Sequence, residues 1–143
     1  MLLRAIGSTD VGVVEQFAPL ASRRDPTKYC LGWGRPGDLG VVAMEGTTTV
    51  GAAWTRLFAE ASPPAEPDIP ELAIAVYAEH RGRGAGRALL DRLFVLLAAG
   101  GHACVDLSVA SDNTAARGLY DRVGFVEVER AADGRLWMRR RVI

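Results

Sequence analysis

Apolar and polar residues follow two different periods along this chain, and these periods predict a succession of short strands and helices. Alternating or continuous short apolar runs predict strands at residues 2–6, 39–44, 48–58, 71–76, 104–109, 125–129 and 135–142. Apolar residues spaced for one helical face predict helices at 11–20, 84–99 and 115–123, and residues 22–36 favour a loop or a short second helix. The pattern therefore predicts a mixed α/β sheet with flanking helices.

Turn-forming and small residues mark several boundaries in this pattern. Ser8-Thr9-Asp10 offers an N-cap for the first helix, and Glu45-Gly46 and Asp133-Gly134 favour the turns of two hairpins. Gly51-Ala52-Ala53 keeps a patch of one strand nearly free of side chains, so that another group can approach it closely. The three arginines at 139–141 are expected at the end of an edge strand, where charge opposes aggregation.

Length and composition limit the class of protein. The 143 residues favour one domain spanning 1–143, with enough chain to bury a core. Seventeen basic and seventeen acidic residues cancel, which argues against nucleic acid or a membrane surface as a partner. Cys30 and Cys104 have no metal-ligand or disulfide spacing, and the longest apolar run, 93–99, is too short to cross a bilayer. We therefore expect a soluble cytoplasmic protein with reduced thiols.

A basic, glycine-rich loop at residues 80–87 separates the strand at 71–76 from the helix that follows. Its three glycines allow close approach of a ligand, and the first N–H groups of the helix face that ligand, so an anion fits there. Arginines at 81, 83 and 87 favour a pyrophosphate. The loop lacks the lysine and hydroxyl of a nucleoside-triphosphate loop, and its glycine spacing differs from that of a dinucleotide fingerprint. Alone, such a loop is equally consistent with a solvated turn.

Two motifs together resemble a known family. Arg81-x-x-Gly84-x-Gly86 after a strand resembles the pyrophosphate loop of the GNAT superfamily of acyl-CoA-dependent N-acyltransferases. The family's second motif is similar to the stretch with Asn113, Ala116, Tyr120 and Gly124-Phe125. The two motifs cover roughly residues 71–126, whereas the first 70 residues match the family only in the order of elements.

The resemblance implies an acyl-CoA N-acyltransferase fold in which two parallel strands, 71–76 and 104–109, splay apart and the pantetheine of acetyl-CoA lies between them. Exposed backbone groups of the first strand, the loop and the start of the last helix would then contact acetyl-CoA. The implied cofactor-binding residues are Ile74, Ala75, Val76, Arg81, Gly82, Arg83, Gly84, Ala85, Gly86, Arg87, Asn113 and Ala116. Asn113 has an equally good alternative role as a helix cap. No metal is required.

The resemblance also implies two catalytic groups. Tyr120 is the candidate general acid, because a phenol with a reference pKa near ~10 stays protonated at neutral pH and can protonate a departing thiolate. Glu71 is the candidate general base for the acceptor amine. Each has an alternative role, Tyr120 in core packing and Glu71 as a strand-end surface residue. Ribosomal-protein N-terminal acetyltransferases of the family carry Leu-Glu-Val where this chain has Leu107-Ser108-Val109, so their usual base is absent.

The predicted function is acetyl-CoA-dependent N-acetyl transfer to a primary amine of a small molecule or peptide, by direct transfer. The alternative from another class is a non-catalytic acyl-CoA-binding or regulatory module, which could dispense with Glu71 and Tyr120. Tyr29 and Trp33 are candidates either for the acceptor pocket or for the core, and the proline-rich stretch 61–70 is either an acceptor-side loop or a plain connector. The acceptor is not encoded in any motif, and a homodimer is left open.

Overall fold

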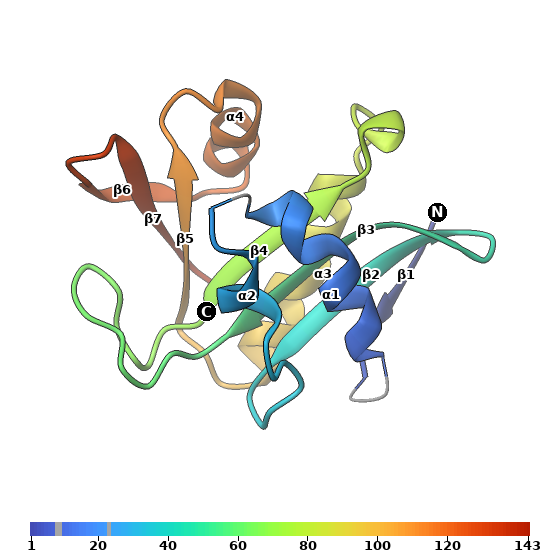
Figure 1. Cartoon of the computed structure of the whole chain (residues 1–143), viewed down its shortest axis with the longest axis horizontal. Coiled ribbons are helices and arrows are strands. Elements are labelled where there is room, and N and C mark those ends of the chain that lie inside the picture. The colour runs from blue at the N-terminus through green and yellow to red at the C-terminus, as the bar shows by residue number, and fades with distance from the viewer. Residues whose placement is uncertain (8–9, 23) are drawn as a thin grey trace.

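The structure, a computed structural model, describes residues 1–7, 10–22 and 24–143. Figure 1 shows one sheet with helices against it. The strands are β1 (Leu2–Ala5), β2 (Leu39–Glu45), β3 (Thr48–Arg56), β4 (Glu71–Val76), β5 (Cys104–Ala110), β6 (Val126–Arg130) and β7 (Arg135–Arg141). The helices are α1 (Val11–Ala21), α2 (Pro26–Cys30), the 3₁₀ turn η1 (Ala78–His80), α3 (Ala85–Ala99) and α4 (Thr114–Arg122). The order of elements agrees with the prediction, and α2 is the short second helix.

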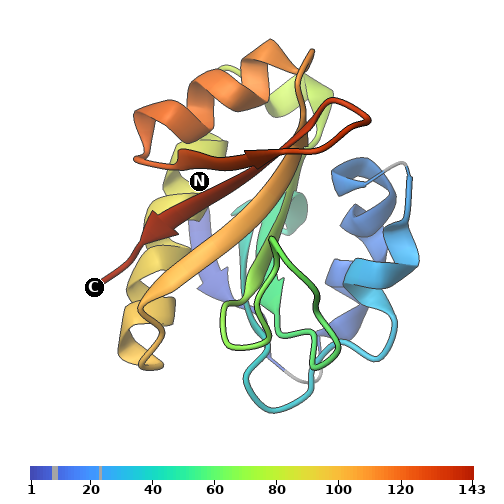
Figure 2. The ribbon, with the colours of Figure 1, turned by 90° about the vertical axis from the view of Figure 1, so that its left-hand side faces the viewer.

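The seven strands form one mixed sheet in the order β1-β2-β3-β4-β5-β7-β6. All pairings are antiparallel except that of β4 with β5, which is parallel, as a crossover through α3 requires. Helices α1 and α2 cover one face of the sheet, and α3 and α4 lie on the other (Figure 2). The predicted mixed α/β class is confirmed.

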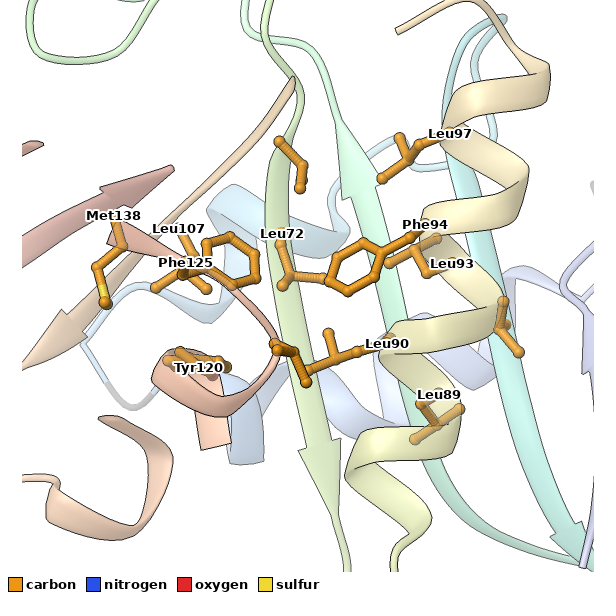
Figure 3. Packing of buried hydrophobic residues seen from close by; sticks show 14 of the residues in the cluster. Leu72, Leu89, Leu90, Leu93, Phe94, Leu97, Leu107, Tyr120, Phe125 and Met138 are labelled. Atoms are coloured by element: carbon orange, nitrogen blue, oxygen red, sulfur yellow. The ribbon is translucent and has the colours of Figure 1, made fainter. Parts of the chain in front are cut away.

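The core on the α3 face is made mainly by leucines of α3 and apolar residues of the central strands. Leu90, Leu93 and Leu97 are fully buried there, and they face Leu72 of β4 and Leu107 of β5 (Figure 3). A second cluster fills the space between the sheet and α1, with Phe17 and Trp54 at its centre. Two buried faces explain why the central strands are apolar on both sides.

The first helix differs in detail from its prediction. Ser8 and Thr9 of the expected cap lie outside the described residues, and the Asp10 side chain makes no capping hydrogen bond to α1. The Asp10 carboxylate instead accepts a 2.9 Å bond from Arg4. Leu20, expected on the buried face, is 47% exposed, and Ala18 is buried in its place. No helix among residues 1–7, 10–22 and 24–143 is long and apolar enough to cross a membrane.

The patch of small residues in β3 provides room for α3. A Cβ added to Gly51 would lie 3.0 Å from the carbonyl oxygen of Ala75 and 3.3 Å from the Leu89 side chain. The groups that approach this patch are therefore the protein's own strand β4 and helix α3.

The prediction for the arginines at 139–141 was wrong, because β7 lies inside the sheet between β5 and β6. Arg139 makes an ion pair with the buried carboxylate of Asp106 at 2.7 Å and with Glu66 at 3.0 Å. The Arg140 guanidinium stacks 4.0 Å from the centre of the Phe94 ring. Contacts with the buried Asp106 and Phe94, and not protection of an edge, account for these two charges.

Candidate active site

Strands β4 and β5 touch at one end and then separate. Their parallel register consists of a single pair, Glu71 with Asp106, joined by a hydrogen bond of 2.9 Å from the Asp106 amide to the carbonyl of Pro70. Figure 1 shows β5 running away from β4 beyond this point. A sheet that opens between two of its central strands leaves main-chain groups on both rims available to a ligand that lies in the opening.

The register of β3 with β4 decides which main-chain groups of β4 face the opening. The amide of Tyr77 bonds the carbonyl of Val50 at 2.9 Å, so Ala75, two residues earlier and opposite Ala52, also belongs to a hydrogen-bonded pair with β3. Ile74 and Val76 therefore point their N–H and C=O groups the other way, toward β5. Of the three predicted backbone contacts, Ile74 and Val76 face the opening and Ala75 faces β3.

The glycine loop lies where β4 ends and α3 begins. Gly82 and Gly84 have φ angles of +75° and +82°, and a Cβ on either would meet no atom within 4 Å, so the space over the loop is open. The first intrahelical hydrogen bond of α3 joins the amide of Ala88 to the carbonyl of Gly84. The amides of Ala85, Gly86 and Arg87 therefore precede any intrahelical partner and can donate to an anion.

Three exposed arginines surround these donors. The Arg81 Nε bonds the carbonyl of Val76 at 3.2 Å, which holds this side chain against the end of β4. Arg87 pairs with Asp91 one turn later at 3.4 Å, as the i,i+4 spacing predicts, and Arg83 is exposed on the loop. Positive φ, open space, free donors and basic side chains fit a pyrophosphate group.

Helix α4 presents the residues of the second motif. The Asn113 side chain accepts a hydrogen bond of 3.2 Å from the amide of Ala116, so it acts as the helix cap and its amide nitrogen is left to donate elsewhere. Tyr120 is 8% exposed and packs edge-on against Phe125 with ring centroids 5.7 Å apart. Burial raises the pKa of Tyr120 to about 12, so its phenol is protonated at neutral pH.

Glu71 lies at the point where β4 and β5 meet, and it is not the exposed strand-end residue of the alternative interpretation. Its side chain is 2% exposed and faces α2. The Tyr29 hydroxyl donates to Glu71 Oε1 at 2.7 Å, and the Lys28 ammonium lies 3.2 Å from the carboxylate. Burial raises the pKa of Tyr29, and the Glu71 carboxylate raises it further.

A depression of about 220 Å³ opens on the same face of the sheet. Ser108 of β5 lies in its wall, together with Arg135 and Trp137 of β7 and Pro64 of the proline-rich stretch, which is thus beside this depression. The Arg135 guanidinium donates to Ser108 Oγ at 3.2 Å. The remaining lining residues are Glu129, Ala131, Asp133 and Leu136.

The sequence did not predict the contacts around Glu71 and Ser108. Trp33 anchors the core, with its Nε1 donating to the carbonyl of Thr55 at 3.3 Å, whereas the buried ring of Tyr29 carries its hydroxyl to Glu71. Arg135 was not singled out. The strand period offered a signal, because Ser108 alternates with the buried Leu107 and so faces the acceptor side of β5.

Comparison with known proteins agrees with this geometry. The sequence matches the acetyltransferase (GNAT) family over residues 12–125, and the chain belongs to this family. A mycothiol acetyltransferase of Corynebacterium kroppenstedtii is 33% identical over 130 residues. That match covers 87% of this chain but 35% of the relative, so the chain spans only part of that protein's length.

Solved structures show the same fold. The ribosomal-protein-S18-alanine N-acetyltransferase of Escherichia coli aligns over 99% of this chain and 93% of its own, with a TM-score of 0.73 and 22% identity. YncA of Salmonella typhimurium, solved with its cofactor acetyl-CoA, aligns over 99% and 94% with a TM-score of 0.76 and 18% identity. The chain thus has an acetyltransferase fold, and acetyl-CoA is the cosubstrate that its family uses.

Proposed function

We propose that this chain is a single acetyltransferase domain that moves an acetyl group from acetyl-CoA to a primary amine of a small molecule or peptide, directly and within a ternary complex. The observation that carries the proposal is the opening between β4 and β5, bounded at one end by the single pair Glu71 with Asp106. The glycine loop and the start of α3 flank it with donors for a pyrophosphate.

Each part of the opening has a task in this reaction. The main-chain groups of Ile74 and Val76 bind the pantetheine amides and polarise the thioester carbonyl. The amides from Gly82 to Arg87 and the side chains of Arg81, Arg83 and Arg87 hold the pyrophosphate. The free amide nitrogen of Asn113 donates to the pantetheine arm, beside Ala116.

The two candidate catalytic side chains lie on opposite faces of the sheet. Tyr120 packs into the core on the α3 face, and Glu71 faces α2 on the other. Tyr120 supplies the proton for the thiolate, for which its raised pKa keeps the phenol protonated. Glu71 takes a proton from the amine, which must lose it before its lone pair can attack. The acceptor approaches through the depression at Ser108.

One observation favours the second candidate function, a non-catalytic acyl-CoA-binding module. Glu71 is tied to Lys28 and Tyr29 as a structural ion pair would be. Such a module needs the loop but no proton transfer.

A panel of amines separates the two functions. We would incubate the protein with acetyl-CoA and, in turn, glucosamine, an aminoglycoside, free amino acids and a short peptide that begins with alanine, and measure release of free thiol. The proposed function predicts thiol release that requires an amine, and a product one acetyl group heavier. Binding of acetyl-CoA with no thiol release for any amine would establish the binding module instead.

A cytoplasmic location also belongs to the proposal. It is supported by the free thiols of Cys30 and Cys104, which are typical of a reducing compartment. Fractionation of the source cells and sedimentation of the purified protein test this location and the possibility of a homodimer.

A further inference from the structure

Three polar groups lead from the buried carboxylate of Glu71 to the depression on the acceptor side. Glu71 Oε1 accepts from the Tyr29 hydroxyl at 2.7 Å. Ser108 lies two residues beyond Asp106, the partner of Glu71 on β5, and so on the same face of the sheet as Glu71, and its hydroxyl lowers the pKa of the Tyr29 phenol. Ser108 Oγ in turn accepts from the Arg135 guanidinium at 3.2 Å, and both residues line the depression. Glu71 itself does not line the depression.

Burial explains why Glu71 needs such a connection. Its side chain is 2% exposed, and Tyr29 covers it from α2. A base so deeply placed cannot touch an amine that stays in the depression, and the residue of β5 that lines the depression is Ser108. The hydroxyls of Tyr29 and Ser108 can each donate one hydrogen bond and accept another, so together they can pass a proton from an amine in the depression to Glu71.

We propose that Tyr29 and Ser108 form a proton relay from the acceptor amine in the depression to Glu71, so that the three residues act as one base. This inference rests on the proposed function and states how the acceptor amine loses its proton.

An amine that arrives as an ammonium ion must lose one proton before it can attack. One N–H proton passes to Ser108 Oγ while the Ser108 proton moves to the Tyr29 oxygen and the Tyr29 proton moves to Glu71 Oε1. The products are a neutral amine and a neutral carboxyl, with both hydroxyls restored. The amine nitrogen then bonds the acetyl carbon, the carbon–sulfur bond breaks, and the second N–H proton ends on the thiol by way of Tyr120. Glu71 later returns its proton to solvent.

Other charged groups around Glu71 are already paired. Lys28 contacts Glu71 itself, and its ammonium is partly exposed. Arg56, opposite Glu71 on β3, lies 3.7 Å from Asp38. Asp106, opposite Glu71 on β5, is bound by Arg139 and by the Trp137 ring nitrogen.

Three charged groups line the depression beside Ser108: the cation of Arg135, which donates to Ser108, and the carboxylates of Glu129 and Asp133. Asp133 is paired with Arg24 at 2.6 Å. A cation there favours the neutral form of a nearby amine, because it repels the ammonium. Arg135 thus acts in the same direction as the relay, whereas the carboxylates of Glu129 and Asp133 favour the ammonium form that the relay must deprotonate.

The test compares pH–rate profiles of variants, with acetyl-CoA saturating and the fastest amine of the panel above as acceptor. Tyr29→Phe and Ser108→Ala should each lower kcat/KM at pH 7 by about 10²-fold, a typical general-base contribution. The deficit should shrink as the pH rises through the amine's own pKa, because a neutral amine needs no relay. Ser108→Thr, which keeps the hydroxyl, should retain most activity.

Two comparisons distinguish a relay from a structural role. Tyr29→Phe combined with Glu71→Gln should be no slower than either variant alone, because breaking one link already breaks the chain. Tyr77→Phe is the matched control, since it removes another phenol that is hydrogen-bonded on the same face, to Gln16 at 2.5 Å, and should keep the parent profile.

Four outcomes would overturn the relay. A Tyr29→Phe deficit that is the same at every pH would give Tyr29 a structural role. Parent-like turnover of Ser108→Ala, beside a pH-dependent deficit of Glu71→Gln, would mean that the amine reaches Glu71 by another route. If the parent binds acetyl-CoA but no amine supports turnover, the proposed function fails and the relay fails with it; turnover in the parent with unaffected relay variants removes the relay alone.

Discussion

Replacing Tyr120 by phenylalanine tests the chemical step with little disturbance to the fold. The ring packs against Phe125 with centroids 5.7 Å apart and is 8% exposed, and phenylalanine keeps that ring and its packing. Only the hydroxyl is lost. A single hydrogen bond contributes about 0.5–1.5 kcal/mol to stability, so the free energy of unfolding should change by no more than that.

The effect on rate should be much larger than the effect on stability. Burial raises the pKa of Tyr120 to about 12, so the phenol holds its proton at neutral pH until a thiolate forms. Loss of a general acid costs about 10²–10⁴ in rate, which corresponds to about 3–5 kcal/mol of barrier. The rate loss should therefore exceed the stability loss severalfold in free energy.

The assay measures thiol release at saturating acetyl-CoA beside a calorimetric measurement of acetyl-CoA affinity. We expect the affinity for acetyl-CoA to stay within about twofold of the parent, where a tenfold change would correspond to about 1.4 kcal/mol. Turnover should be at least about 10²-fold lower. Parent-like turnover would make Tyr120 a packing residue and leave the mechanism without its acid.

Three further predictions follow from the loop, the buried phenol and the buried ion pair. Gly84→Val should weaken acetyl-CoA binding by more than tenfold, about 1.4 kcal/mol, in calorimetry. Gly101→Val is its control, because it imposes a similar positive φ, +85° against +82°, at the other end of α3; equal losses would mean strain alone. Folding raises the pKa of Tyr120 from 10.0 to about 12, so the unfolded chain releases this proton first. The free energy of unfolding should therefore fall as the pH rises between these two values, and it should fall less in Tyr120→Phe. Chemical denaturation at several pH values measures this, and equal slopes for the parent and Tyr120→Phe would contradict the prediction. Asp106→Ala breaks a buried ion pair and should lower the free energy of unfolding in urea by about 3–5 kcal/mol. Glu66→Ala is the control, because Glu66 is exposed, and it should cost no more than about 1 kcal/mol. Similar losses for the two variants would contradict the structural role given to the buried pair.

The order and type of elements could be predicted because each carries its own local signal. Period-two and period-3.6 apolar patterns, the turn at Asp133-Gly134 and the glycine that precedes α3 are all properties of short segments. The glycine of that turn has φ +85°, and the Ala131 amide bonds the Arg135 carbonyl across it at 2.8 Å. Local chemistry alone is enough for such features.

The features that could not be predicted depend on contacts between distant segments. Arg139–141 form a run of like charge in the sequence, but their partners, Asp106 and Phe94, come from other elements. Glu71 looks like a strand-end glutamate until α2 brings the Tyr29 hydroxyl onto it, 42 residues away in the sequence. Which amides of β4 face the opening depends on the register with β3, which no motif specifies.

Amide hydrogen exchange tests the central claim, that acetyl-CoA lies in the opening between β4 and β5, most directly. The amides of Ile74 and Val76 face the opening, whereas the amide of Ala75 bonds β3. We expect the first two to exchange rapidly in the free protein and to become protected at saturating acetyl-CoA, and that of Ala75 to be protected in both states. Ile74 and Val76 amides that are already protected in the free protein, or that still exchange rapidly at saturating acetyl-CoA, would contradict the account.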